Sequence, residues 1–206
     1  MLKLLAWLAP LPLLAIQPFR IEVVDKENGW PVPLVELKTT HDVRHVTDNL
    51  GVIALDDPEL MNHEVWFGIK GQGYGVAKDG FGYEGVRAKP VPGGKLRIEV
   101  ERRIVAKRLG RLTGAGVFAE AEKLGDKVPE VDFGVHGCDT VQVARYGDRL
   151  FWLWGDTSIP QYALGIFTST AATTGLKPFS RFEPPLVPPF DYFRNEHKEV
   201  RGVVDL

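Results

Sequence analysis

The chain has 206 residues, of which 44% are hydrophobic and 25% charged, and its formal net charge is −2 at pH 7. This length and composition suit one or two globular domains with a packed core. The densest basic stretch, at 102–111, is too short and too broken to follow a phosphate backbone. We interpret it as a solvated strand end or linker and expect no nucleic-acid partner.

The N-terminus is typical of an export signal. Lys3 precedes an apolar run, Leu4–Ile16, that is interrupted by two prolines and is too short to cross a bilayer comfortably. We therefore expect residues 1–17 to be a signal peptide, with an uncleaved anchor or a buried first element as the alternative. Cys138 is the only cysteine, so no intrachain disulfide can form. Together these features predict a secreted or periplasmic protein of a bacterial envelope, with no membrane span in the mature chain.

Alternating apolar and polar residues predict a small all-β module over 19–101. Asn28 and Gly29 form a turn signal, because this pair readily adopts the positive φ of a tight reversal. Prolines just before residue 34 predict an edge position for the strand that follows them. The expected strands are 20–25, 34–39, 43–46, 52–55, 65–70 and 95–101.

Three motifs in this module carry a family resemblance. They are Ile-Glu-Val-Val-Asp at 21–25, Gly-Trp-Pro-Val-Pro-Leu-Val-Glu-Leu at 29–37, and Thr-Asp-Asn-Leu-Gly-Val-Ile at 47–53. In kind and order they resemble the carboxypeptidase regulatory-like, transthyretin-like β-sandwich, and the resemblance implies a non-catalytic companion domain. The transthyretin-like hydrolases carry a C-terminal Tyr-Arg-Gly-Ser, which this sequence lacks, so that activity is rejected.

Residues 102–133 are expected to connect this module to a second one at 134–206. Within the connector, Val117–Leu124 is compatible either with one or two helical turns that end at Gly125 or with an edge strand. The sequence leaves both alternatives open.

The second module begins with a strand, a hairpin turn and an aromatic strand, at 140–143, Tyr146–Arg149 and 150–154. A Gly-Asp-Thr sequence containing Asp156 is expected to leave the aromatic strand at the rim where Asp139 enters the first. A hairpin brings these two ends together, so both carboxylates are expected to face one mouth. In the alternative, Asp156 caps a turn and Asp139 pins a loop.

This arrangement resembles one blade of the five-bladed β-propeller glycoside hydrolases, in which an Asp at the start of the first inner strand is the general base. The resemblance places Asp139 in that role. Thr140 follows it, where Asp-Pro is common in the family. The family's general acid and third carboxylate belong to later blades, so an incomplete propeller is expected over 134–206. The predicted fold class is therefore all-β, a transthyretin-like sandwich followed by a partial propeller.

The expected function is that of an exported carbohydrate-active protein, a glycoside hydrolase in its complete form with Asp139 as catalytic residue. The alternative is a non-catalytic envelope protein for carbohydrate binding or adhesion. In both cases the expected partner is a carbohydrate or cell-envelope glycan, with Asp156, Trp154 and Tyr162 binding it. Trp152 and Trp154, two residues apart on one strand face, are alternatively blade core. The proline-rich stretch at 177–190 is expected to be a rigid loop.

No cofactor or metal is expected. A Gly-x-Gly-x-x-Gly match at 80–85 is followed by a proline-containing stretch rather than a helix, so it does not predict a nucleotide site. His41 and His45 have a spacing that suits zinc on a helix, but their neighbours favour strand and turn. Cys138, close to His136, is interpreted as a small buried residue rather than a nucleophile.

Overall fold

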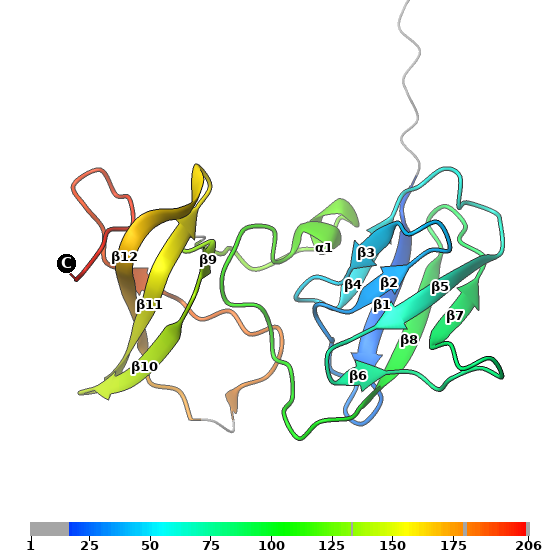
Figure 1. Ribbon diagram of the computed structural model, residues 1–206, viewed down its shortest axis with the longest axis horizontal. Coiled ribbons are helices and arrows are strands. Elements are labelled where there is room, and N and C mark those ends of the chain that lie inside the picture. The colour runs from blue at the N-terminus through cyan, green and yellow to red at the C-terminus, as the bar shows by residue number, and fades with distance from the viewer. Residues whose placement is uncertain (1–16, 133, 179–180, 205–206) are drawn as a thin grey trace, which may run out of the picture.

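The computed structural model describes residues 17–132, 134–178 and 181–204, without the side chain of Leu164. The described strands form three sheets, accompanied by one short helix (Figure 1). The all-β prediction is confirmed. Among the described residues, no sheet closes into a barrel and no set of sheets forms a closed propeller.

The N-terminal half is built from two four-stranded sheets. The first has the order β4-β1-β8-β6, and β1 and β8 are its only parallel pair. The second has the order β3-β2-β5-β7 and is antiparallel throughout. The bounds are β1 Phe19–Asp25, β2 Glu36–Lys38, β3 Arg44–Val46, β4 Val52–Leu55, β5 Val65–Lys70, β6 Tyr74–Gly75, β7 Gly85–Ala88 and β8 Lys95–Arg102.

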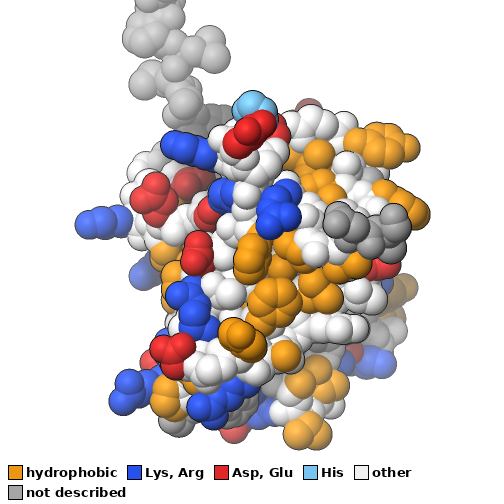
Figure 2. All heavy atoms as spheres, turned by 90° about the vertical axis from the view of Figure 1, so that its left-hand side faces the viewer, with side chains coloured by type: hydrophobic (Ala, Val, Ile, Leu, Met, Phe, Trp, Pro, Cys, Tyr) orange, Lys and Arg blue, Asp and Glu red, His pale blue; other side chains and the backbone are white. Residues whose placement is uncertain are grey.

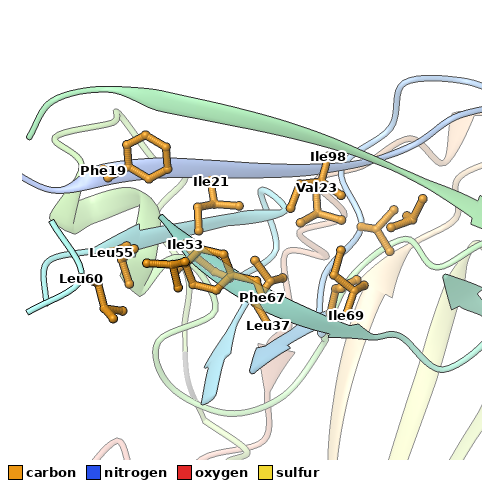
Figure 3. Close-up of a cluster of buried hydrophobic side chains, with 14 of the residues drawn as sticks. Phe19, Ile21, Val23, Leu37, Ile53, Leu55, Leu60, Phe67, Ile69 and Ile98 are labelled. Atoms are coloured by element: carbon orange, nitrogen blue, oxygen red, sulfur yellow. The ribbon is translucent and has the colours of Figure 1, made fainter. Parts of the chain in front are cut away.

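The core of this half lies between the two sheets (Figure 3). Alternation in β1 buries Ile21 and Val23, and its neighbour β4 buries Ile53. The facing sheet supplies Leu37 and Phe67, and all five side chains are fully buried. Side chains from both sheets therefore share one apolar layer, as in a β-sandwich. Burying each of these large side chains stabilises the fold by roughly 1.5–3 kcal/mol.

The position of β2 differs from the sequence-based prediction. The prolines before it predicted an edge strand, but β2 lies between β3 and β5. The prediction was wrong because the prolines stand before the paired segment and remove no donor from its ladder. Pro31 instead makes a single antiparallel bridge with Val24.

The turn at 47–51 is held by its own side chains. The Thr47 hydroxyl donates to the carbonyl of Val32 at 2.8 Å. The Asp48 carboxylate accepts the Leu50 N–H at 2.9 Å, which closes an Asx turn. Gly51 has φ +67°, and a Cβ there would lie 2.6 Å from the Val23 carbonyl oxygen, so glycine is required at this position.

The connector docks on that turn. The second carboxylate oxygen of Asp48 accepts the Ala121 N–H at 2.8 Å. Asn49 donates to the Arg111 carbonyl at 2.9 Å and accepts the Arg111 N–H at 2.8 Å. The connector carries helix α1, Ala119–Lys123, so of the two open alternatives the structure has the helix. The chain leaves it through Gly125, whose φ is +80°.

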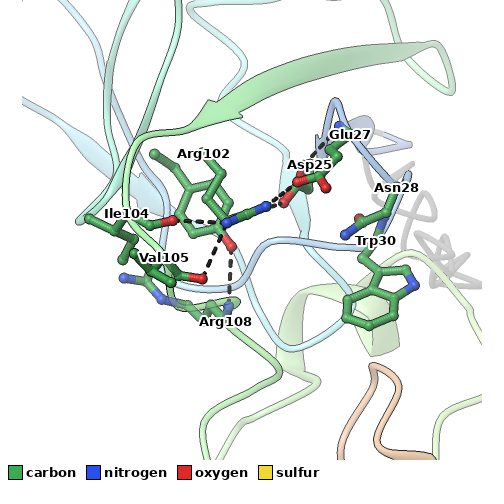
Figure 4. A network of polar contacts seen from close by, with 9 residues as sticks. Asp25, Glu27, Asn28, Trp30, Arg102, Ile104, Val105 and Arg108 are labelled. Carbon is green, nitrogen blue, oxygen red and sulfur yellow. Dashed lines mark hydrogen bonds and ion pairs between the residues drawn. The ribbon is translucent and has the colours of Figure 1, made fainter. Parts of the chain in front are cut away.

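The basic stretch after β8 is bound to the sandwich. Arg102 pairs with Asp25 at 3.4 Å and with Glu27, and it donates to the carbonyl oxygens of Ile104 and Val105 (Figure 4). Arg108 donates to backbone carbonyls of the sandwich, among them that of Pro33 at 2.8 Å. These guanidinium groups are bound to the protein itself, in a stretch that the sequence predicted to be a solvated strand end or linker.

The C-terminal half is a five-stranded sheet with the order β10-β11-β12-β13, and β9 also pairs with β11. The predicted strand, hairpin turn and aromatic strand are confirmed as β10 and β11. The prediction that the chain leaves the aromatic strand at Gly155–Thr157 was wrong, because β11 continues to Ile159 through register shifts. The bounds are β9 Gly137–Cys138, β10 Val141–Tyr146, β11 Arg149–Ile159, β12 Tyr162–Gly175 and β13 Asp191–Tyr192.

Hydrophobic side chains gather on the side of the molecule formed by this sheet (Figure 2). Exposed large apolar residues of its strands are Val141, Val143, Tyr146, Tyr162 and Phe167. Val141 and Val143 share one face of β10, and Tyr146 lies on the other face.

The predicted signal peptide falls almost entirely on residues outside the described part of the chain. Among the residues from Gln17 onward that the structure describes, no helix is long and apolar enough to cross a bilayer.

Docking of the connector should stabilise the sandwich measurably. A fragment of residues 17–127 should have a free energy of unfolding about 2–5 kcal/mol higher than a fragment of 17–103. The shorter piece loses the hydrogen bonds of Asp48 and Asn49 to the connector and the burial of Val117 and Phe118. Urea unfolding of both fragments measures the difference. The Asn49→Ala variant of the longer fragment should fall between them, and equal stability of the two fragments would contradict the docking.

Asp48 should also make stability depend on pH. Burial raises the pKa of its carboxyl above the ordinary value of 3.8, against the opposing hydrogen bonds from three backbone N–H groups. The folded state then holds the proton better than the unfolded state. The contribution of Asp48 to the free energy of unfolding should therefore fall as pH rises from about 4 through the raised pKa. Urea unfolding across this range should show that slope in the parent and lose it in Asp48→Asn, which also loses about 1–3 kcal/mol throughout.

Candidate functional site

Asp139 and Asp156 come to neighbouring positions at one place on the C-terminal sheet. Cys138 pairs with Thr157, and Val141 pairs with Trp154. Between these two pairs the Gly155 N–H donates to the Thr140 carbonyl at 3.1 Å. The same register therefore runs from β9 into β10, and it sets Asp139 beside the Gly155–Asp156 segment of β11.

The two carboxylates have different surroundings. Asp139 is exposed; one of its oxygens lies against Gly155 and accepts the Thr140 hydroxyl at 3.2 Å. Asp156 is half-buried and pairs with Ser169 where the β11–β12 register shifts. Among the described residues, neither carboxylate takes part in an ion pair. Both are available as acceptors, and neither lines the 450 Å³ cavity described below.

The absence of a side chain at Gly155 leaves the space that the Asp139 carboxylate occupies. A Cβ at this position would meet the Asp139 carboxylate and the Thr140 hydroxyl. Sequence reasoning did not assign Gly155 a role, although a glycine inside an aromatic strand signals a bulge or a close approach.

Trp154 belongs to the core of this half. It is 1% exposed. Its ring lies 5.2 Å from that of Phe190 and 5.6 Å from that of Tyr192, and it stacks on Trp152 at 6.3 Å. An indole enclosed in this way has no face to offer a sugar, so the substrate-binding role predicted for Trp154 does not fit this conformation. The alternative prediction, in which Trp154 is part of the core, fits this conformation.

Trp152 is the tryptophan that reaches a cavity. It is half-buried, and its indole N–H donates to the Thr174 hydroxyl at 2.9 Å. The cavity, of about 450 Å³, lies between the β11–β12 ladder and the proline-rich segment. Its polar lining includes Lys177 and Glu183, and its other walls are Pro129, Leu150, Gly175, Leu176, Phe182, Pro185, Leu186, Val187, Pro188 and Pro189.

Tyr162 lies elsewhere, at the β11–β12 hairpin. It is 73% exposed and pairs with Ile159 at the turn. The structure therefore gives Asp139 and Asp156 neighbouring backbone positions, with the Asp139 carboxylate turned to Gly155, and places Tyr162 and Trp154 outside the 450 Å³ cavity. Sequence reasoning missed the cavity. The proline-rich stretch that forms one of its walls was the available signal, but it was interpreted only as a rigid loop.

The chemistry of the remaining candidates is limited. Among the described residues, no three His, Cys, Asp or Glu side chains are grouped to hold a metal ion. His45 lies in β3 rather than on a helix. Burial, with a smaller effect of the Asp139 charge, raises the pKa of the Cys138 thiol above 9.0, which disfavours the thiolate a nucleophile needs.

No family model matches this chain, and no curated protein and no solved structure matches it.

Gly155→Ala should lower the melting temperature slightly, because the added methyl group displaces the exposed Asp139 carboxylate and the Thr140 hydroxyl, which can move aside at a cost of about 0.5 kcal/mol. Gly175→Ala is the matched control, since a Cβ there meets no atom within 4 Å. Adding Asp139→Ala to Gly155→Ala should recover part of the loss in thermal unfolding. Equal melting temperatures for the two single variants would contradict the close approach.

Proposed function

We propose that this chain binds carbohydrate without cleaving it, in the cavity lined by Trp152 and the proline-rich segment. The observation that carries the proposal is a half-buried indole at the wall of a 450 Å³ cavity that also presents charged and hydroxyl side chains. Cavities of this size hold small ligands, and a few convergent polar groups orient them.

The chemistry of the walls suits a sugar ring. The C–H face of a pyranose packs on an aromatic or apolar surface, and Trp152 together with the prolines supplies one. Its hydroxyl groups need both donors and acceptors. Lys177 donates and Glu183 accepts at the same cavity.

The indole is fixed before a ligand arrives. Trp152 is held by its hydrogen bond to Thr174, by stacking on Trp154 with 12° between the rings, and by an edge contact with Phe190 at 5.3 Å. A side chain that is already ordered loses little entropy when it binds. This arrangement favours recognition of a rigid ring.

Hydrolysis is the second candidate, and the neighbouring positions of Asp139 and Asp156 favour it. Glycoside hydrolysis requires two carboxyl groups, one protonated and one ionised, on either side of the scissile bond. Asp139 would act as general base, and the acid would come from a further blade. Export to the bacterial envelope, supported by the apolar N-terminal run, belongs to both candidates.

Binding is tested by screening the full chain against a glycan array and then titrating the best glycan by calorimetry. Glu183→Gln and Lys177→Met should each weaken binding by about tenfold, the effect of one charged hydrogen bond. Glu59→Gln and Lys70→Met, on the sandwich, are matched controls that should leave affinity unchanged. Absence of binding to every glycan, or equal losses in the controls, would contradict the proposal.

Asp139→Asn separates the two candidates. The test uses a form of the protein that includes the further blade carrying the acid. If that form is a hydrolase, this variant should lose about 10²–10⁴ in turnover with an unchanged melting temperature, because an amide cannot take the proton from water. If it only binds, the parent should cleave none of the glycans that it binds, and Asp139→Asn should keep the parent's affinity. Release of reducing ends measures cleavage of a glycan, and calorimetry measures affinity for the same glycan.

A further inference from the structure

A second hollow adjoins the 450 Å³ cavity. It has a volume of about 770 Å³, and four of its lining residues, Pro129 and Val187–Pro189, also line the first cavity. Its own walls are Glu130, Val131, Asp132 and Phe190. The two hollows therefore meet along the proline-rich segment and the end of the connector. We call the second one the distal hollow.

Each hollow has an aromatic wall, and the two rings are packed against each other. Trp152 lines the first cavity and Phe190 lines the distal hollow. Their ring centroids lie 5.3 Å apart, with 89° between the planes. Phe190 makes a similar edge contact with the buried Trp154, at 5.2 Å. Both aromatic walls are thus in place before a ligand arrives, which lowers the entropy lost on binding.

The distal hollow differs from the first cavity in its polar groups. It presents the carboxylates of Glu130 and Asp132, and no Lys or Arg is among its lining residues. Asp132 is paired with the Arg194 guanidinium. Glu130 is in no ion pair within the described part of the chain, and neither is Glu183 of the first cavity. Each hollow therefore has one carboxylate available to accept hydroxyl groups.

The two hollows together exceed what one sugar ring needs. Sites of roughly 300–1,000 Å³ hold a small ligand, and each hollow lies within that range by itself. A single sugar on Trp152 would leave Phe190 and Glu130 without a contact. A linear chain can place one sugar beside each ring and pass over the shared prolines, which offer C–H surface and no N–H donor.

The charges select the kind of chain. Outside ion pairs, the two hollows present one base, Lys177, and two acids, Glu183 and Glu130. A glycan with carboxylate or sulfate groups would set like charges beside Glu130, which opposes binding. The hydroxyl groups of a glycan without such groups can instead donate to it.

We propose that the ligand of this site is a linear chain of at least two sugar residues without acidic groups. One residue lies on Trp152 in the first cavity, and the next reaches Phe190 and Glu130 in the distal hollow. This assignment rests on the carbohydrate-binding function proposed above, and it adds the length and the charge of the glycan.

The test measures affinity against glycan length, with the full chain and calorimetry. The probes are the glycan that binds best on the array and its fragments of one, two, three and four sugar residues. The dissociation constant should fall by about tenfold or more from the single sugar to the longer fragments, because a further residue adds a charged hydrogen bond in the distal hollow. It should level off once both hollows are filled.

Glu130→Gln distinguishes the two hollows. It should raise the dissociation constant of the longer fragments by about tenfold and leave that of the single sugar unchanged. Glu183→Gln, in the first cavity, should weaken binding at every length. Glu59→Gln on the sandwich is the matched control and should change none of these affinities.

Three results overturn this assignment while leaving carbohydrate binding in place. The first is a single sugar that binds as tightly as the longest fragment. The second is a Glu130→Gln variant with the parent's affinity at every length. The third is a best-binding glycan that carries acidic groups. Absence of binding to every glycan on the array instead overturns the proposed function itself, and this assignment with it.

Discussion

The turn at 47–51 is the constraint on which the rest of the structure depends. Asp48 uses one carboxylate oxygen to close its own turn and the other to hold the first residues of α1 through the Ala121 N–H. Asn49 completes a two-way amide pair with the Arg111 backbone. A polar cluster of the sandwich thus fixes the path of the connector. The connector in turn reaches the proline-rich segment, where the Leu186 N–H donates to the Leu109 carbonyl at 3.4 Å.

The C-terminal half is organised differently, around aromatic rings from separate segments. Trp152 and Trp154 come from β11, Tyr192 from β13 and Phe190 from the segment before it. Two buried hydroxyls, those of Thr157 and Thr170, satisfy each other at 2.8 Å beside this cluster. The cluster gives the two tryptophans unequal roles. Trp154 is enclosed and stabilises the sheet, whereas Trp152 lines the cavity.

Sequence reasoning succeeded where the determinants are local. Alternation and turn residues predicted β1, β5 and the β10–β11 hairpin, and hairpin geometry predicted the neighbouring backbone positions of Asp139 and Asp156. That both carboxylates face one mouth stays a prediction. It failed where distant segments decide. The interior place of β2 depends on the pairing of β3, and the burial of Trp154 depends on Phe190 and Tyr192. The cavity beside Trp152 needs residues 182–189 folded back on the sheet, which no local pattern encodes.

The parallel pairing of β1 with β8 carries a consequence for the order of folding. The first described strand finds this neighbour only when Lys95–Val100 has been made, because Arg20 pairs with Lys95 and Asp25 with Val100. During synthesis β1 can therefore pair with β4 alone until β8 has been made. The sandwich cannot be completed until most of its sequence has left the ribosome. Contacts this distant in sequence slow folding. In that interval one edge of β1 stays unpaired.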